Sequence, residues 1–265
     1  MKLNVVPALT GVIWVRLGIK TFWRQPVALS GLFFMFMALL SLLSVIPYVG
    51  NFLALTLLPA ATLGLMAAAR EANLDRFPMP SVLISGLTEN PDRRKSMLIL
   101  GLLYALGFYA ILGISSFYDG GNFANLYLNG GTFSPETLNS SGFQNAMWVA
   151  TALYLPLSTL FWHAPALIHW HGEPALKSLF FSFVACWSNW RAFLMYGLTW
   201  AAIFVSVAAT LALMTLVIEG DEWISFILLP VMLLLAAMFF ASSYFTFLDC
   251  FIKDPVLAWA PKTIA

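Results

Sequence analysis

Charged residues are scarce in this chain. Lys, Arg, Asp and Glu make up 9% of its 265 residues, whereas soluble globular domains carry about 25%. Hydrophobic residues make up 61%, and the mean hydropathy is +0.86. Such a chain has too few charges to cover a water-exposed surface, so its composition indicates a protein that lies in lipid.

Cysteine and enzyme motifs are also scarce. The two cysteines, Cys186 and Cys250, are not spaced as a pair, which excludes a disulfide framework and a CxxC redox or zinc motif. The sequence contains no HExxH, GxSxG, Walker A or GxGxxG motif, and no apolar run carries paired carboxylates. We therefore expect no catalytic residue and no cofactor.

Six apolar runs are long enough to cross a membrane. About 18 residues suffice, because a helix rises about 1.5 Å per residue and the hydrocarbon core is about 30 Å thick. Helices satisfy their own backbone polar groups in lipid, so we expect an all-α, polytopic helical bundle that forms one integral membrane domain over residues 1–265. The expected spans cover residues 27–46, 52–69, 97–117, 146–168, 193–218 and 223–248.

The positive charges lie on one side of these spans. All 13 Lys and Arg residues precede the first span, follow the last, or lie in the second or fourth loop. The positive-inside rule therefore predicts that both termini are cytoplasmic. The opening MKLNVVPALTG lacks the apolar core and cleavage site of a secretory signal, so we expect it to be retained. The charged residues of the other three loops are all acidic. They are Asp119, Glu136, Glu219, Asp221 and Glu222.

Basic and aromatic residues gather next to the spans. Residues 8–25 predict an interfacial helix with a basic stripe that recurs every four residues, and its Trp14, Phe22 and Trp23 are expected at headgroup depth. A second interfacial helix is predicted after Pro174, where large apolar residues recur at helical spacing. These charges either anchor the spans or contact anionic lipid or a partner. The candidate contact residues are Arg16, Lys20, Arg24, Arg93, Arg94, Lys95, Lys177 and Arg191.

The three histidines, His163, His169 and His171, invite a metal hypothesis. Zinc would take three or four ligands in a tight shell, with Glu173 as the fourth. However, His163 and His169 lie on different faces of a helix, and Pro165 disturbs the helix between them. Tryptophans flank the histidines, so we favour interfacial anchoring and expect no metal site.

Each even-numbered span contains a proline, at Pro59, Pro156 and Pro230. An apolar inner segment precedes each odd-numbered span, so the sequence predicts three parallel copies of a two-span unit. Proline bends a helix and frees a carbonyl group. The three expected kinks either line a shared cavity or pack around one another.

The loop over 118–145 is the only sizeable segment outside the spans. Its Gly, Asn, Ser and Thr content predicts irregular structure. The alternative is a short re-entrant or surface helix around Phe123, Leu126, Tyr127 and Leu128.

Three stretches of the chain resemble an uncharacterised family of proteobacterial inner-membrane proteins. They are PALTGVIWVRLGIKTFWRQP, LLPAATLGLMAA and HAPALIHWHGEPALKSLFFSFVACWSNWRAFLMYGL. The family is distantly similar to YciC-type proteins and to the membrane domain of some bacterial glycerophosphodiester phosphodiesterases. The resemblance implies a helical bundle in the bacterial cytoplasmic membrane, and it implies no activity or catalytic residue.

Two functions remain open at this point. The first is a non-enzymatic membrane component that interacts with lipids, with other membrane proteins or with itself. The alternative is a permease-like protein that binds or moves an amphiphilic solute through a cavity lined by the proline-bearing spans. The middles of the spans hold no ionisable residue, which argues against an ion-driven pump. We expect no nucleic-acid partner.

Overall fold

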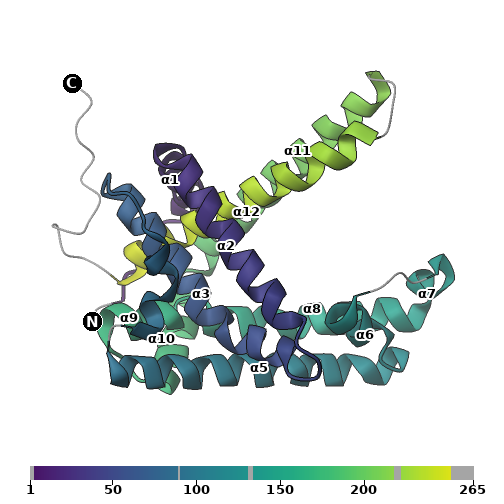
Figure 1. Ribbon diagram of the computed structural model, residues 1–265, viewed down its shortest axis with the longest axis horizontal. Helices are drawn as coiled ribbons and strands as arrows, with labels where there is room; N and C mark the ends of the chain where they lie inside the picture. Colours follow the sequence, from purple (N-terminus) through teal and green to yellow (C-terminus); the bar gives the residue numbers. More distant parts are fainter. Residues whose placement is uncertain (1–2, 89, 131–133, 218–221, 252–265) are drawn as a thin grey trace. The chain divides into compact units, whose positions relative to one another are not determined.

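The computed structural model describes residues 3–88, 90–130, 134–217 and 222–251, and these residues are almost entirely helical (Figure 1). The expected all-α bundle is therefore confirmed. Lys2, Lys253, Lys262 and the acidic turn at Glu219 and Asp221 lie outside the described residues. The elements are α1 Thr10–Arg24, α2 Pro26–Ser44, α3 Gly50–Asn73, η1 Pro80–Ile84, α4 Ser85–Thr88, α5 Pro91–Asp119, α6 Asn122–Asn129, α7 Pro135–Asn139, α8 Ser141–Phe161, α9 Ala164–His171, α10 Ala175–Ser188, α11 Trp190–Val217 and α12 Glu222–Phe251.

Within the described ranges, five helices are long and apolar enough to cross a membrane, namely α2, α3, α5, α11 and α12. Helix α8 occupies the fourth expected span and has 21 residues, but it is not among the five. Gln144 and Asn145 in its first turn lower its hydropathy. The structure thus supports a polytopic membrane protein, and the sixth crossing stays a prediction.

The fourth expected span, 146–168, is not one helix. Helix α8 ends at Phe161 and α9 begins at Ala164. Pro165 causes the break, because it has no N–H to donate to the preceding turn, and it lies instead in the first turn of α9. Ser182 of α10 bridges the break, since its Oγ accepts the N–H of His163 at 2.9 Å and donates to the carbonyl of Thr159 at 2.8 Å.

The described chain forms two compact units. One comprises the described residues within 1–37, 61–85 and 184–265, and the other comprises those within 38–60 and 86–183. Helices α2, α3 and α10 each contribute to both units. The sequence predicts one integral membrane domain, and the prediction that the two units act as one domain is not tested by the structure.

In the first unit, α1 packs closely against both α11 and α12. Two glycines allow this approach. A Cβ atom on Gly11 would collide with the backbone of Ala192 and Tyr196, and one on Gly18 would lie 2.6 Å from the Cα of Ser242. Small residues at such crossings are typical of membrane helices, because close backbone approach supplies the packing energy.

This packing buries two of the three α1 aromatics that the sequence places at headgroup depth, and the depth itself stays a prediction. Trp14 and Phe22 are buried in the protein, and only Trp23 is exposed. The Trp14 ring lies 5.3 Å from that of Phe193, measured between ring centroids, and its Nε1–H donates to the Asp249 carboxylate at 2.7 Å. Helix α1 is therefore part of the core of its unit rather than a helix that only rests at the headgroups.

In the second unit, α5 packs along α8. A Cβ atom on Gly101 would collide with the carbonyl of Thr56, so α3 also approaches closely. The segment 118–145, expected to be irregular, instead contains α6 and α7, which bears out the alternative of a short helix. The Asp119 carboxylate accepts the N–H groups of Gly121 and Phe123, at 2.9 and 2.6 Å, and so starts α6. Helix α6 then packs on α5 and α8.

We predict that Gly18→Leu will destabilise the protein, because the added side chain has no space beside Ser242. Overpacking of this kind costs about 1–3 kcal/mol. The melting temperature in detergent should therefore fall. Gly197→Leu on α11 is the matched control, since nothing lies within 4 Å of its Cβ position. Equal melting temperatures for the two variants would contradict the close packing of α1.

Candidate functional site

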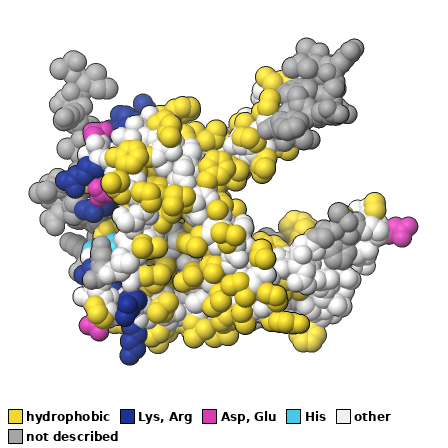
Figure 2. Space-filling model, in the orientation of Figure 1, with side chains coloured by type: hydrophobic (Ala, Val, Ile, Leu, Met, Phe, Trp, Pro, Cys, Tyr) yellow, Lys and Arg dark blue, Asp and Glu magenta, His cyan; other side chains and the backbone are white. Residues whose placement is uncertain are grey.

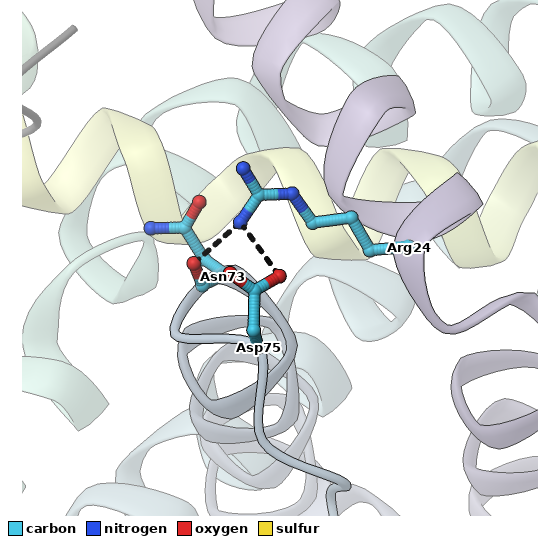
Figure 3. A network of polar contacts seen from close by, with 3 residues as sticks. All are labelled: Arg24, Asn73 and Asp75. Carbon is cyan, nitrogen blue, oxygen red and sulfur yellow. Dashed lines mark hydrogen bonds and ion pairs between the residues drawn. The ribbon is translucent and has the colours of Figure 1, made fainter. Parts of the chain in front are cut away.

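Arg24 is exposed at the surface, and its guanidinium contacts the chain itself. Its Nη1 donates to the carbonyl of Asn73 at 2.6 Å and lies 3.4 Å from the Asp75 Oδ1 atom (Figure 3). Asn73 is the last residue of α3, where backbone carbonyls lack helical partners and a cation is favourable. Arg24 therefore ties the end of α1 to the end of α3. Arg16 and Lys20, from the same predicted stripe, are exposed.

Arg93 also contacts the chain itself. Its Nη1 donates to the carbonyl of His169 at 2.8 Å, at the end of α9. Gly172 ends α9 with a φ of +69°, and its Cβ position lies 3.8 Å from the Arg93 Nε. The left-handed conformation favours glycine here, and the nearby guanidinium leaves little room for a larger side chain. Arg93 thus joins the start of α5 to the end of α9.

Arg94 and Lys95 are both exposed on the first turns of α5. They line an open depression of about 540 Å³ together with aliphatic side chains of the same helix. The two cations and the positive end of the helix therefore lie beside an apolar wall. This arrangement suits a molecule with a negative group and a hydrocarbon chain. The lining residues are Pro91, Asp92, Arg94, Lys95, Leu98, Ile99 and Leu102.

Helix α10 turns its small side chains inward. Ser178, Ser182 and Ala185 are fully buried, whereas Leu176 and Trp187 are each 72% exposed. Phe180 and Phe183 are exposed on the same stripe. A stripe of large apolar side chains would be costly in water, and it is the expected outer surface for a helix that lies against hydrocarbon.

The two basic residues near α10 already have neighbours. The Lys177 Nζ lies 2.8 Å from a Glu173 carboxylate oxygen and 5.4 Å from the centre of the Phe181 ring. The Arg191 guanidinium lies over the Trp190 ring at 5.5 Å. Both side chains are exposed at the surface, and Lys177 already has a carboxylate partner in Glu173.

The three histidines lie in different surroundings. His163 is fully buried at the start of α9, His169 is also buried, and His171 is exposed. Partial burial lowers the pKa of His171. Over the part of the chain that the structure describes, no three His, Cys, Asp or Glu side chains gather as metal ligands.

The prolines lie where the sequence predicts. Pro59 is inside α3, Pro156 inside α8 and Pro230 inside α12, and each helix continues through its proline. The kinks and the shared cavity proposed for these helices stay predictions.

Cys186 lies on the buried face of α10, and burial raises the pKa of its thiol to about 12. A thiol with so high a pKa is poorly nucleophilic at neutral pH. Its position indicates a structural role for this side chain.

Asn189 is a contact that the sequence analysis did not single out. Its side chain accepts the N–H of Val6 at 2.8 Å and donates to the carbonyls of Asn4 and Ala185, at 2.9 and 3.0 Å. It therefore fixes the segment before α1 against the corner between α10 and α11. The sequence offered one signal for this contact, since Asn189 is the single amide side chain in the run CWSNW. An amide that becomes buried needs hydrogen-bond partners.

A relative of the same length supports the membrane assignment. The chain is 36% identical over 267 aligned residues to a probable inner membrane protein of Burkholderia thailandensis, and the alignment covers 99% of both chains. No protein-family model matches the chain. No solved structure matches it significantly. An identity of this size along the full length of both proteins places the chain in the same family of inner-membrane proteins as the Burkholderia protein.

Proposed function

We propose that this protein is a non-enzymatic component of the bacterial inner membrane that binds anionic phospholipid at its cytoplasmic side. The observation that carries the proposal is the depression at the start of α5. Arg94 and Lys95 lie there beside Leu98, Ile99 and Leu102, all on one exposed helix face.

The chemistry of a phospholipid matches this face in two ways. Its phosphate would lie near the two cations, which outnumber the one carboxylate of the lining, Asp92, and near the positive end of the α5 dipole. Its acyl chain would lie along the aliphatic side chains below. Each basic residue near an anionic membrane surface contributes about 1 kcal/mol. Arg93 belongs to the same cluster, but its bond to His169 makes it a residue that positions the site.

The surface of the protein also supports a membrane component that binds lipid. Hydrophobic side chains cover much of the visible surface, and charged ones are few (Figure 2). The exposed stripe on α10 adds aromatic side chains that suit the membrane interface. The distant resemblance to YciC-type proteins and to the phosphodiesterase-linked membrane domain belongs to this proposal, because amphipathic helices precede spans in both.

The cytoplasmic orientation is part of the proposal. Arg24, Arg70, Arg93 and Lys95 all lie at the ends of α1, α3 and α5 that the positive-inside rule assigns to the cytoplasm. The opposite end of α5 carries Asp119, which starts α6. Both termini are then cytoplasmic if α8 crosses the membrane.

We predict that the double variant Arg94→Gln/Lys95→Gln will lose anionic lipid. Native mass spectrometry of the protein from nanodiscs of phosphatidylglycerol and phosphatidylethanolamine should show roughly tenfold or greater loss of retained phosphatidylglycerol, since two contacts of about 1 kcal/mol are removed. Insertion and melting temperature should be unchanged, because both side chains are exposed.

The charge-matched control is Arg76→Gln/Lys177→Gln, which also removes two exposed positive charges. It should retain phosphatidylglycerol like the parent protein. An equal loss in both double variants would indicate a general effect of charge and would refute a specific site on α5.

We predict that an alkaline phosphatase reporter fused after Asn139 will be active, because this enzyme works only outside the cytoplasm. The same reporter fused after Asp75 should be inactive. The measurement is phosphatase activity per unit of fusion protein in whole bacterial cells. Activity at Asp75, or none at Asn139, would overturn the proposed orientation.

A further inference from the structure

A second, chemically different pocket lies in the unit formed by residues 38–60 and 86–183. It is a half-open cavity of about 130 Å³ between α5, α6 and α8. None of its lining side chains carries a charge at neutral pH. They are Phe108, Ile111, Leu112, Phe123, Tyr127, Ala150, Thr151 and Tyr154.

Four aromatic rings surround this cavity. The Phe108 ring lies 5.5 Å from that of Tyr127 and 6.3 Å from that of Tyr154, measured between ring centroids. The Phe123 ring lies 5.9 Å from that of Tyr127. The rings come from three helices, so α6 covers a site whose walls belong to α5 and α8.

Phenolic hydroxyl groups converge beside these rings. The Tyr104 and Tyr154 hydroxyls lie 3.4 Å apart and form a long hydrogen bond in which either can donate. Partial burial raises the pKa of Tyr127, and the nearby Tyr154 raises it further. Tyrosines from α5, α6 and α8 therefore place hydrogen-bonding groups next to an otherwise apolar wall.

The cavity lies within reach of the bilayer interior. Its α5 residues, Phe108 to Leu112, precede the outer end of that helix at Asp119 by 7 to 11 residues. At about 1.5 Å per residue this places them roughly 10–16 Å along the helix from its end. A ligand would therefore arrive from the membrane and would carry an apolar portion.

We propose that this cavity binds the head of a neutral amphiphile, and that the head is a single six-membered ring bearing oxygen, of the phenol or quinone class. The volume suits one ring, since a cavity of about 150 Å³ accepts benzene. Aromatic walls favour ring contacts. The tyrosine hydroxyls would donate to the ring oxygen, and the uncharged lining excludes an ionic head, which separates this site from the basic depression on α5.

The experiment uses the full chain in nanodiscs and ligand-detected saturation-transfer NMR, with the signal of empty nanodiscs subtracted. The probes are 4-hexylphenol and 2-decyl-1,4-benzoquinone, whose heads are single rings without bulky substituents. Binding of one probe and not the other distinguishes a phenol site from a quinone site. The control ligand is 1-decanol, which has a chain and an oxygen but no ring. We expect saturable binding of a ring probe that 1-decanol does not displace.

Ala150→Leu should fill the cavity and weaken ring binding at least tenfold. Ala152→Leu is the matched control, because Ala152 is exposed on the same helix and does not line the cavity. Tyr154→Phe keeps the ring and removes one hydroxyl, so it should weaken binding roughly two- to tenfold, the worth of one hydrogen bond. This variant also tests the site if Ala150→Leu fails to fold.

Three results would overturn the proposal. Equal binding of 1-decanol and the ring probes would show that the ring is not recognised. Undiminished ring binding in both Ala150→Leu and Tyr154→Phe would place the ligand elsewhere. Loss of a retained phospholipid in Ala150→Leu, with no ring binding in the parent protein, would assign the cavity to an acyl chain.

Discussion

A polar group that is buried between the helices of this chain must find a partner on the chain itself, and this constraint joins segments that are distant in the sequence. The Asp249 carboxylate of α12 accepts the indole N–H of Trp14, so α1 is drawn against α12. Ser182 joins the two sides of the break between α8 and α9. Asn189 satisfies the backbone of the segment before α1. Leaving such groups unpaired in an apolar medium would cost several kcal/mol each.

Close packing complements these bonds. Lipid tails are as apolar as leucine, so large apolar side chains gain little by facing one another in a membrane. The chain places glycine, serine and alanine where helix backbones come closest, while large side chains such as Trp14 and Phe22 fill the remaining space between helices. Gly11 and Gly18 show this on α1, and Ser178 and Ser182 show it on α10. The amphipathic pattern of α10 is real, but its apolar side faces away from the protein.

The sequence predicts features that depend on local pattern. The apolar runs, the prolines inside helices and the basic helix ends all follow from residue spacing and appear in the structure. Features that depend on distant contacts were not predictable. The sequence does not reveal that Arg24 and Arg93 donate to carbonyls at helix ends whereas Arg94 lines the open depression, nor that Trp14 is buried. The convergence of Tyr104, Tyr127 and Tyr154 likewise requires α6 to fold back on α5 and α8. The interruption at Pro165 had a local signal, but the apolar run around it favoured a continuous span.

The burial of both cysteines has a practical consequence. Cys186 and Cys250 lie inside the packed helices, and thiol reagents modify accessible thiolates. Maleimide reagents should therefore label the natural chain only weakly. A cysteine introduced at an exposed position would then be the main site of labelling, and Cys186 and Cys250 would not have to be replaced first. Spectroscopic probes can in this way be attached to one helix after another in an otherwise unaltered protein.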